Sequence, residues 1–389
     1  MNALTHPVAL PDLSDDELRR FGRHLILPEF AIEGQRRLKA GSVLLIGLGG
    51  LGSPTALYLA AAGVGRIGLV DADVVEETNL QRQIAHGYKV LGKPKIESAR
   101  ARMLDLNPDV VIEMHQTRLN LDNAVALISQ YDVIIDGTDN FPTRYLVNDT
   151  CVKLGKPNVF GGVLRFDGQL SVFDARHGPC YRCMFPEAPP IEFAPNCAEA
   201  GVLGVLPGVI GALQATEAIK LLTGIGTPMI GRMLVYDGLD LSFNTMEIAK
   251  DPDCPTCSLP AADIVLHETV MVCAMPVGRS IGAQALAARL ADGEDLLLLD
   301  VRNPPEWATG QIAGVISLSK PDLEDALGQS GAVPLAGLPT DRDIVVICQS
   351  GMRSNAAIKA MVAAGYDPAR LYNLDQGMNA WAGEVCVPA

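Results

Sequence analysis

Short apolar runs alternate with helical patterns along the first 250 residues of the chain. Three of these runs are SVLLI at 42–46, RIGLV at 66–70 and DVIID at 132–136, and each has the length of a buried strand. The first run continues into a glycine-rich turn, after which Ser53 and Pro54 are typical of a helix start. Alternating strands and helices favour a mainly parallel sheet covered on both faces, which predicts a doubly wound α/β domain.

Further elements flank this pattern. Residues 12–40 have a helical pattern, in which Ser14 and Glu17 have the spacing of a capping box. From Asn158 the sequence becomes rich in strand-forming residues, with Asp167-Gly168 as the expected hairpin turn. A long apolar helix is expected over residues 208–223.

A second α/β pattern begins near residue 280, after a segment rich in proline and small residues at 251–278. Its buried-strand runs are LLLLDV at 296–301 and DIVVIC at 343–348, and helices are expected over 321–327 and 355–365. We therefore predict a first domain at 1–255, a linker at 256–279 and a smaller α/β domain at 280–389.

Charge and composition exclude several classes of protein. The net charge is −14 and no run of basic residues occurs, so the clustered cations that nucleic acids or anionic membranes require are lacking. The N-terminus lacks the charged-then-apolar pattern of a signal peptide. The apolar stretch at 43–70 contains seven glycines and Pro54, which a membrane-spanning helix rarely carries. We expect a soluble, cytoplasmic protein with no nucleic-acid or membrane partner.

The glycine-rich turn has the features of a nucleotide-binding loop. Its glycines are Gly47, Gly49, Gly50 and Gly52, and it lies between a strand and a helix. Glycine lets the backbone approach a phosphate, and the N-terminus of the helix supplies positive potential. Asp71 ends the next strand, where a carboxylate can bind ribose hydroxyls. Alone, this pattern suits NAD, FAD or ATP.

Polar clusters after the strands favour a triphosphate over a dinucleotide. A triphosphate needs more cations than a pyrophosphate does, and Arg82, Lys95 and Arg144 are the candidates. Asp139 follows a buried strand, where a carboxylate suits Mg²⁺ that is held jointly with phosphate oxygens. The other members of these clusters are Thr78, Asn79, Leu80, Gln81, Thr138 and Asn140.

The motifs GLGGLG, NLQRQ, GKPK and GTDN, in this order and spacing, resemble the ubiquitin-activating superfamily over about residues 10–250. The resemblance is strongest to the bacterial enzymes that adenylate the small subunit of molybdopterin synthase or the thiamine sulfur carrier. It implies a Rossmann-like adenylating domain that uses ATP and Mg²⁺. It also implies that Arg23 reaches the ATP of a neighbouring subunit, and hence a homodimer. The residues implied in contact with ATP or its metal are Gly50, Asp71, Asn79, Arg82, Lys95 and Asp139.

Four of the nine cysteines form two Cys-x₂-Cys pairs, Cys180 with Cys183 and Cys254 with Cys257. Together they offer the tetrahedral Cys₄ set of a structural zinc site that clasps two distant segments. Two disulfides are the alternative, which an intracellular compartment disfavours, and redox-active pairs are a third. The family resemblance also implies structural zinc here.

Cys348 begins the loop CQSGMRS at 348–354, between an apolar strand and a helical segment. A cysteine at the N-terminus of a helix lies beneath backbone N–H groups, which stabilise a thiolate or a persulfide anion. Gly351 can supply the positive φ that such a cradle requires, and Arg353 can add positive charge. We therefore predict catalytic roles for Cys348 and Arg353.

This loop resembles the active-site loop of rhodanese sulfurtransferases, and DVRNPPEW, GQIAG and GMNAW extend the resemblance over about residues 280–385. It implies that Cys348 carries a persulfide. Two positions depart from the family: Gln349 stands where a basic residue is common, and Gln311 where histidine is common. The lower positive charge favours a protein persulfide, as from a cysteine desulfurase, over thiosulfate as the donor.

Two other cysteines have open roles. Cys197 precedes the long apolar helix and is either a small buried residue or a catalytic one, since some members of the family are proposed to hold the activated carrier on a cysteine near this position. Cys386 lies near the C-terminus and either resolves a persulfide or is an idle thiol, and we favour the idle role.

These features together predict a fused adenylyltransferase and sulfurtransferase. It would adenylate the C-terminal glycine of a ubiquitin-like sulfur carrier ending in Gly-Gly, and then convert it to a thiocarboxylate with sulfur from Cys348. The alternatives are an NAD-dependent oxidoreductase with a sulfurtransferase tail, an adaptor with vestigial sites, and activation of a ubiquitin-like protein for conjugation. The pathway stays open among molybdenum cofactor, thiamine, cysteine, thiolated tRNA and a secondary metabolite.

Overall fold

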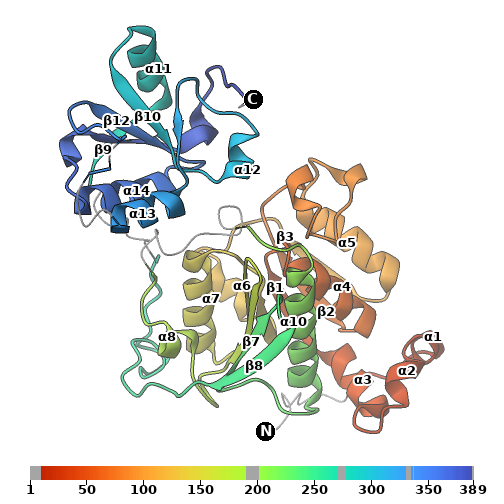
Figure 1. The fold of residues 1–389 in the computed structure, drawn as a ribbon. Helices are drawn as coiled ribbons and strands as arrows, with labels where there is room; N and C mark the ends of the chain where they lie inside the picture. The colour runs from red at the N-terminus through yellow and green to blue at the C-terminus, as the bar shows by residue number, and fades with distance from the viewer. Residues whose placement is uncertain (1–9, 190–200, 270–276, 330–333, 336, 388–389) are drawn as a thin grey trace. The chain divides into compact units, whose positions relative to one another are not determined.

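The computed structural model describes residues 10–189, 201–269, 277–329, 334–335 and 337–387. The chain divides into two compact units, Met1–Ala188 with Asn196–Val270 and Pro189–Pro195 with Met271–Ala389 (Figure 1). Residues 256–269, which we expected in the linker, pack on the first unit. Lys153 donates to the backbone oxygens of Ala261 and Ile264 at 3.3 and 2.8 Å, and Ile264 is buried.

An eight-stranded sheet forms the centre of the first unit, in the order β3-β2-β1-β4-β5-β6-β7-β8. Strands β1 to β5 are parallel, and β6, β7 and β8 are antiparallel to their neighbours. The strand order reverses between β1 and β4, which is where ligands bind in open α/β sheets. The strands are β1 Ser42–Ile46, β2 Arg66–Val70, β3 Val111–His115, β4 Val133–Asp136, β5 Asn158–Leu164, β6 Asp167–Phe173, β7 Arg232–Asp237 and β8 Ser242–Glu247.

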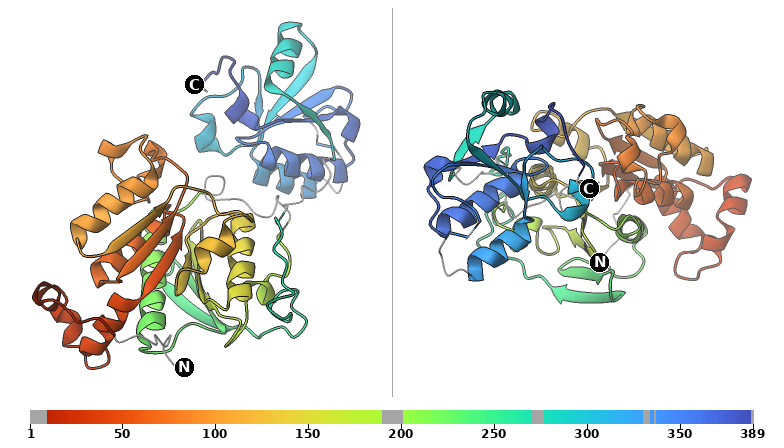
Figure 2. Two further views of the ribbon diagram at one scale, coloured as in Figure 1. Left: turned by 180° about the vertical axis from the view of Figure 1, so that it is seen from behind. Right: turned by 45° about the horizontal axis from the view of Figure 1, so that its top comes forward.

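Helices cover both faces of this sheet (Figures 1 and 2). On β1, Val43 and Leu45 pack into the apolar core with α4, α5 and α10, whereas Leu44 and Ile46 face α6 and α7. This strand is therefore buried on both faces, as its uninterrupted apolar run predicts. The helices of the unit are α1 Asp15–Arg20, α2 Gly22–Leu25, α3 Ala31–Ala40, α4 Gly52–Ala62, α5 Lys95–Leu106, α6 Ala124–Ile128, α7 Phe141–Leu154, α8 Tyr181–Met184 and α10 Leu206–Thr223, with 3₁₀ turns η1 Glu77–Asn79 and η2 Tyr88–Val90.

The expected hairpin is present, but the turn predicted at Asp167-Gly168 is wrong. Leu164 pairs with Asp167, so the turn is formed by Arg165 and Phe166, and Arg165 has φ +53°. Gly168 instead lies in β6, where a Cβ would come within 2.5 Å of the Ile210 side chain of α10. This glycine therefore makes room for a helix rather than for a turn.

A five-stranded parallel sheet forms the second unit, in the order β11-β10-β12-β13-β9. α13 and α14 pack on one face of this sheet and α11 packs on the other. The strands are β9 Arg279–Ile281, β10 Leu296–Asp300, β11 Ile316–Ser317, β12 Asp343–Ile347 and β13 Leu371–Leu374. The helices are α11 Ala283–Ala291, α12 Pro304–Trp307, α13 Lys320–Gln329 and α14 Met352–Ala363, with 3₁₀ turns η4 Pro368–Arg370 and η5 Gly377–Ala380.

Both sheets confirm the predicted fold class, a larger doubly wound α/β unit and a smaller α/β unit. The helix expected at 208–223 begins at Leu206, with Pro207 in its first turn, and the helix expected at 355–365 begins already at Met352. In the parts of the chain that the structure describes, each helix is too short or too polar to cross a lipid bilayer.

Candidate active sites and metal centre

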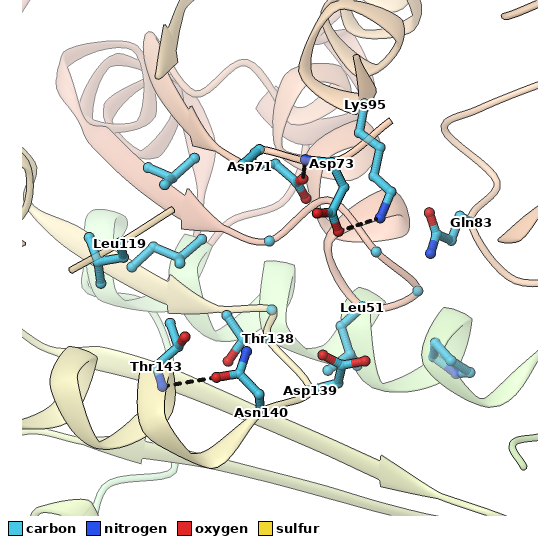
Figure 3. A pocket seen from close by; sticks show the side chains of 18 of the residues that line it. Leu51, Asp71, Asp73, Gln83, Lys95, Leu119, Thr138, Asp139, Asn140 and Thr143 are labelled. Carbon is cyan, nitrogen blue, oxygen red and sulfur yellow. Dashed lines mark hydrogen bonds and ion pairs between the residues drawn. The ribbon is translucent and has the colours of Figure 1, made fainter. Parts of the chain in front are cut away.

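A cavity of about 430 Å³ opens beside the carboxyl ends of β1, β2 and β4, where the strand order reverses. Figure 3 shows Asp71, Asp73 and Lys95 on one side of this cavity and Asp139 with Asn140 on the other. The polar wall combines cations, carboxylates and exposed backbone. Such a wall suits a ligand that carries phosphates and a ribose.

The glycine loop between β1 and α4 is folded too tightly for side chains at two positions. A Cβ on Gly52 would lie 1.9 Å from the oxygen of Gly47, and Gly47 itself has φ +90°. Gly49 differs, because the nearest atom to its Cβ would be the Gln83 side chain at 3.8 Å. Since packing does not require glycine at position 49, its bare backbone is free to contact a bound phosphate.

Two carboxylates at the end of β2 organise this side of the cavity. Asp71 accepts the backbone N–H groups of Leu48 and Asp73 at 2.7 and 2.8 Å, and so fixes the glycine loop. Asp73 lies 3.2 Å from Nζ of Lys95 and 3.6 Å from Nη2 of Arg118. Lys95 is buried while Arg118 is exposed, so Asp73 balances two cations that face the cavity.

The end of β4 supplies the other wall. Asp136 accepts hydrogen bonds from the N–H and hydroxyl of Thr138 at 3.0 and 2.6 Å, which fixes the turn that presents the exposed Asp139. Asn140 caps α7 by accepting the N–H of Thr143 at 3.0 Å. Burial raises the pKa of the Asp136 carboxyl above its ordinary value, although the Arg144 guanidinium opposes this rise.

Arg144 lies away from the cavity wall. Its guanidinium donates to the backbone oxygens of Thr138 and Gly161 at 3.1 and 3.3 Å, and its Nε lies 3.5 Å from Asp136. It also stacks over the ring of Phe160 at 4.6 Å. In this structure the residue supports the wall rather than presenting its charge to a ligand.

The structure brings about half of the predicted nucleotide residues together. Those that line the cavity are Gly47, Gly49, Gly50, Asp71, Arg82, Lys95, Thr138, Asp139 and Asn140. Those placed elsewhere are Gly52 at the start of α4, Thr78, Asn79, Leu80 and Gln81 in and just after η1, Arg144, and Arg23, which is exposed on α2. Polar residues of the wall that the sequence motifs did not indicate are Asp73, Gln83, Thr117, Arg118 and Thr143.

The four paired cysteines converge on one point in the first unit. Sγ of Cys180 lies 3.5 Å from that of Cys254, and Sγ of Cys183 lies 3.4 Å from that of Cys257. All four sulfur atoms are within 4.8 Å of one another. Tetrahedral zinc with Zn–S bonds of about 2.3 Å sets its sulfur ligands about 3.8 Å apart, so the donor set fits a structural zinc ion.

Cys348 is buried at the end of β12, beneath the N-terminus of α14. Its Sγ accepts the N–H of Gly351 at 3.1 Å and the hydroxyl of Ser354 at 3.3 Å. Gly351 has φ +89°, as the predicted cradle requires. The backbone of Gly377 packs directly against Cys348, because a Cβ on Gly377 would lie 2.1 Å from the backbone oxygen of Cys348.

Charged groups around the loop are paired. Arg302 and Asp300 form a buried ion pair at 2.8 Å, and Arg302 also reaches the Gln349 side chain at 3.5 Å. Arg353 binds both carboxylate oxygens of Glu306 at 2.6 Å. Partial burial raises the pKa of Glu306, but the hydrogen bonds from Arg353 and from the backbone N–H of Asn303, together with the charges of Arg353 and Arg302, hold this pKa below its ordinary value.

Cys197 and Cys386 are the two cysteines with open roles. Cys197 lies outside the described residues. Cys386 is exposed and exchanges backbone hydrogen bonds of 2.8 Å with Gln311, whose side chain donates to Asp300 at 3.1 Å. Gln311 is thus a structural partner of the buried Asp300–Arg302 pair.

Comparison with known families defines the class of protein. A model described as the ThiF family matches residues 21–256, and one described as a rhodanese-like domain matches residues 282–384. The chain belongs to the ThiF family and carries a C-terminal rhodanese-like domain, which confirms the resemblance expected from the motifs.

Curated relatives extend this likeness to the whole chain. The chain is 45% identical over 387 residues to the probable adenylyltransferase/sulfurtransferase MoeZ of Mycobacterium tuberculosis, covering 96% of this chain and 95% of that protein. It is 40% identical over 393 residues to the adenylyltransferase and sulfurtransferase MOCS3-1 of Drosophila pseudoobscura, covering 97% and 86%. The chain is therefore an enzyme of the adenylyltransferase/sulfurtransferase type that uses ATP.

Solved structures share the fold. Escherichia coli MccB with MccA-N7isoASN has a TM-score of 0.57 at 21% identity, covering 64% of this chain and 76% of that chain. MccB with ATP has a TM-score of 0.54 at 19% identity, covering 64% and 83%. At this identity the likeness supports the α/β fold alone.

Proposed function

We propose that the first unit adenylates the C-terminal glycine of a ubiquitin-like sulfur carrier, and that the second unit converts it to a thiocarboxylate with sulfur from a Cys348 persulfide. The observation that supports this proposal is the presence of two anion cradles in one chain. One is a cation-lined cavity at a glycine loop, and the other surrounds a buried thiol.

Adenylation needs positioning and charge neutralisation rather than a protein nucleophile. The carrier carboxylate attacks the α-phosphorus of ATP, the bond to pyrophosphate breaks, and an acyl-adenylate remains. Arg82, Lys95 and Arg118 line the cavity and would neutralise the phosphates. On binding, the phosphates would replace Asp73 as the partner of Lys95. Asp139 is exposed in the wall and would hold Mg²⁺ together with phosphate oxygens.

Sulfur transfer then uses the activated carboxyl. The terminal sulfur of the Cys348 persulfide attacks the acyl carbon and expels AMP, which forms an acyl disulfide between the carrier and Cys348. A cellular thiolate attacks the Cys348 sulfur, releases the carrier thiocarboxylate and leaves a mixed disulfide, which a second thiol reduces. The N–H of Gly351 and the hydroxyl of Ser354 would stabilise the sulfur anion at each stage.

Three further roles complete the proposal. The four-cysteine cluster would hold structural zinc, and these reduced thiols support the expected cytoplasmic location. On a route through Cys197, the Cys197 thiolate would first expel AMP to form a thioester, and the Cys348 persulfide would then expel Cys197 instead of AMP; Cys197→Ala should then slow thiocarboxylate formation without slowing adenylation. Arg23 would reach the nucleotide of a second subunit in a homodimer, since its exposed place on α2 leaves it available to a partner.

ATP–pyrophosphate exchange tests the first step directly. We expect exchange only with a carrier that ends in Gly-Gly, and none with the same carrier shortened by one glycine. Binding of NAD in preference to ATP, or exchange that ignores the carrier terminus, would contradict the proposal and favour the oxidoreductase alternative.

A further inference from the structure

Two residues of the segment 302–306 contact the loop 348–354, one near each end of the loop. Arg302 contacts Gln349, the residue after Cys348, and Glu306 binds Arg353, which lies in the first turn of α14. Arg302 precedes Asn303, the N-cap of α12 Pro304–Trp307, and Glu306 lies within this helix. Gln349 is also tied to Asn379, whose side-chain oxygen accepts from Nε2 of Gln349 at 2.7 Å.

The contact between Glu306 and Arg353 is bidentate and half-buried. Both Glu306 oxygens accept from the guanidinium at 2.6 Å, and the two side chains are 29% and 19% exposed. Within 348–354, a stretch that the structure describes in full, Arg353 is the only cationic side chain. The positive charge of Arg353 is thus balanced by the carboxylate of Glu306, which lies outside the loop. The neighbouring cation, Arg302, is balanced by the buried Asp300.

We propose that Glu306 determines which sulfur donor Cys348 accepts, because it neutralises the cation of the loop and so withholds charge from small anionic donors. The loop then favours sulfur delivered by a protein, whose persulfide is placed by protein–protein contacts. This inference rests on the proposed persulfide at Cys348 and deepens it by naming the group that selects the donor.

Thiosulfate is the small donor that tests this role. The Cys348 thiolate attacks its outer sulfur, the S–S bond of thiosulfate breaks, and sulfite leaves with the electron pair, so that Cys348 gains one sulfur. Cyanide then removes this sulfur as thiocyanate and restores the thiolate. Thiosulfate is a dianion, so its capture depends on the local charge at the loop, whereas neither ATP nor a carrier is needed.

Glu306→Gln is a conservative variant for this purpose. Glutamine is accepted at this position of a capping box, and it keeps one oxygen for a hydrogen bond while it removes the negative charge. We expect kcat/KM for thiosulfate to rise about tenfold, mainly through a lower KM, and the rise to shrink at high salt. Glu324→Gln breaks the pair with Lys320 in the same unit and is the matched control, expected to change little. A Glu306→Gln variant that behaves like this control, or loses thiosulfate activity, would overturn the proposal.

Two further measurements test whether Glu306 acts through the charge of Arg353. The double variant Glu306→Gln/Arg353→Gln should lose the gain, because the cation that Glu306 neutralises is itself removed. In the unaltered protein, kcat/KM for thiosulfate should not fall as ionic strength rises from about 0.02 to 0.5 M, because the loop offers no uncompensated charge to be screened. A severalfold fall with salt would overturn the proposal even if Glu306→Gln did not fold. Neither measurement requires carrier thiocarboxylation. A failure of the proposed thiocarboxylation can therefore be told apart from a failure of the role proposed for Glu306.

Discussion

The two candidate active sites are built on the same plan. In each unit a central parallel strand ends in a glycine-containing turn that leads into a helix, β1 into α4 and β12 into α14. At each turn a glycine admits backbone where a side chain would collide: Gly52 of the first turn itself lies beside Gly47, and Gly377 of η5 lies beside Cys348. Both turns can therefore offer backbone N–H groups to an anion.

The sites differ in how they treat charge. The nucleotide cavity is open and faces Arg82, Lys95 and Arg118, as a ligand with several phosphates requires. The sulfur site has its cysteine buried, and its nearby cations are matched with carboxylates. A strand, a glycine-containing turn and a helix start can thus cradle an anion in either unit. The charged side chains around the turn then set how much negative charge the site attracts.

Removing the exposed carboxylate of the nucleotide cavity should have the largest effect on one site alone. Asp139→Ala should lower the rate of ATP–pyrophosphate exchange by about 10²–10³-fold, the usual cost of losing one electrostatic contact in a transition state. Because Asp139 is exposed, stability should change little. Sulfur transfer from thiosulfate to cyanide should be unchanged, and a parallel loss there would contradict the separation of the two sites.

A matched pair of glycine substitutions should separate the two cradles. Gly52→Ala should reduce exchange, and Gly377→Ala should reduce sulfur transfer, each by about a hundredfold, which is the cost of displacing a site by about 1 Å. In both variants the added Cβ meets a backbone oxygen, at 1.9 and 2.1 Å. Gly208→Ala and Gly282→Ala are the controls, because a Cβ at either position meets nothing within 4 Å. Loss of both activities in either variant would refute the independence of the units.

Gly49→Ala tests whether the loop approaches a ligand. Its Cβ has room in the protein, so we expect an unchanged melting temperature. A phosphate on the loop would meet the methyl group, so ATP affinity should fall about tenfold, as moderate steric crowding does. Calorimetric titration with ATP measures this. Full affinity would place the phosphates elsewhere.

The smallest expected effect concerns the acid stability of the second unit. The pKa of Glu306 is lowered in the folded protein, so its pairing with Arg353 stabilises above the unfolded value near 4.5 and is lost as pH falls through the folded value. Because both groups are partly exposed, the contribution is below about 1 kcal/mol. Denaturant unfolding of Glu306→Gln should therefore show a weaker loss of stability below pH 4.5 than the unaltered protein shows. An equal loss in both proteins would contradict this.

Local patterns predicted the cradles well because each is formed by consecutive residues. Gly47 to Gly52 and Cys348 to Ser354 need only a strand, a turn and a helix start. Asp71 and Asp139 were predicted as well, since the carboxyl ends of parallel strands meet at one edge of a sheet.

Contacts between segments far apart in the sequence could not be predicted from local sequence patterns. Arg144 was expected to bind phosphate, yet the buried Asp136 holds it behind the cavity wall. Gly168 was expected in a turn, whereas the structure shows that a glycine is needed there because the Ile210 side chain of α10 packs against it. The pair of Glu306 and Arg353 joins residues 47 positions apart, so no local spacing reveals it.

The central claim is that Cys348 supplies sulfur to a carboxyl group that the first unit has activated. Its most direct test is mass spectrometry of a Gly-Gly-ending carrier incubated with ATP, a persulfide donor and either the unaltered protein or Cys348→Ala. We predict the thiocarboxylate only with the unaltered protein, while the variant keeps ATP–pyrophosphate exchange. Thiocarboxylate formed by the variant at the normal rate, or loss of exchange in a folded variant, would contradict the account.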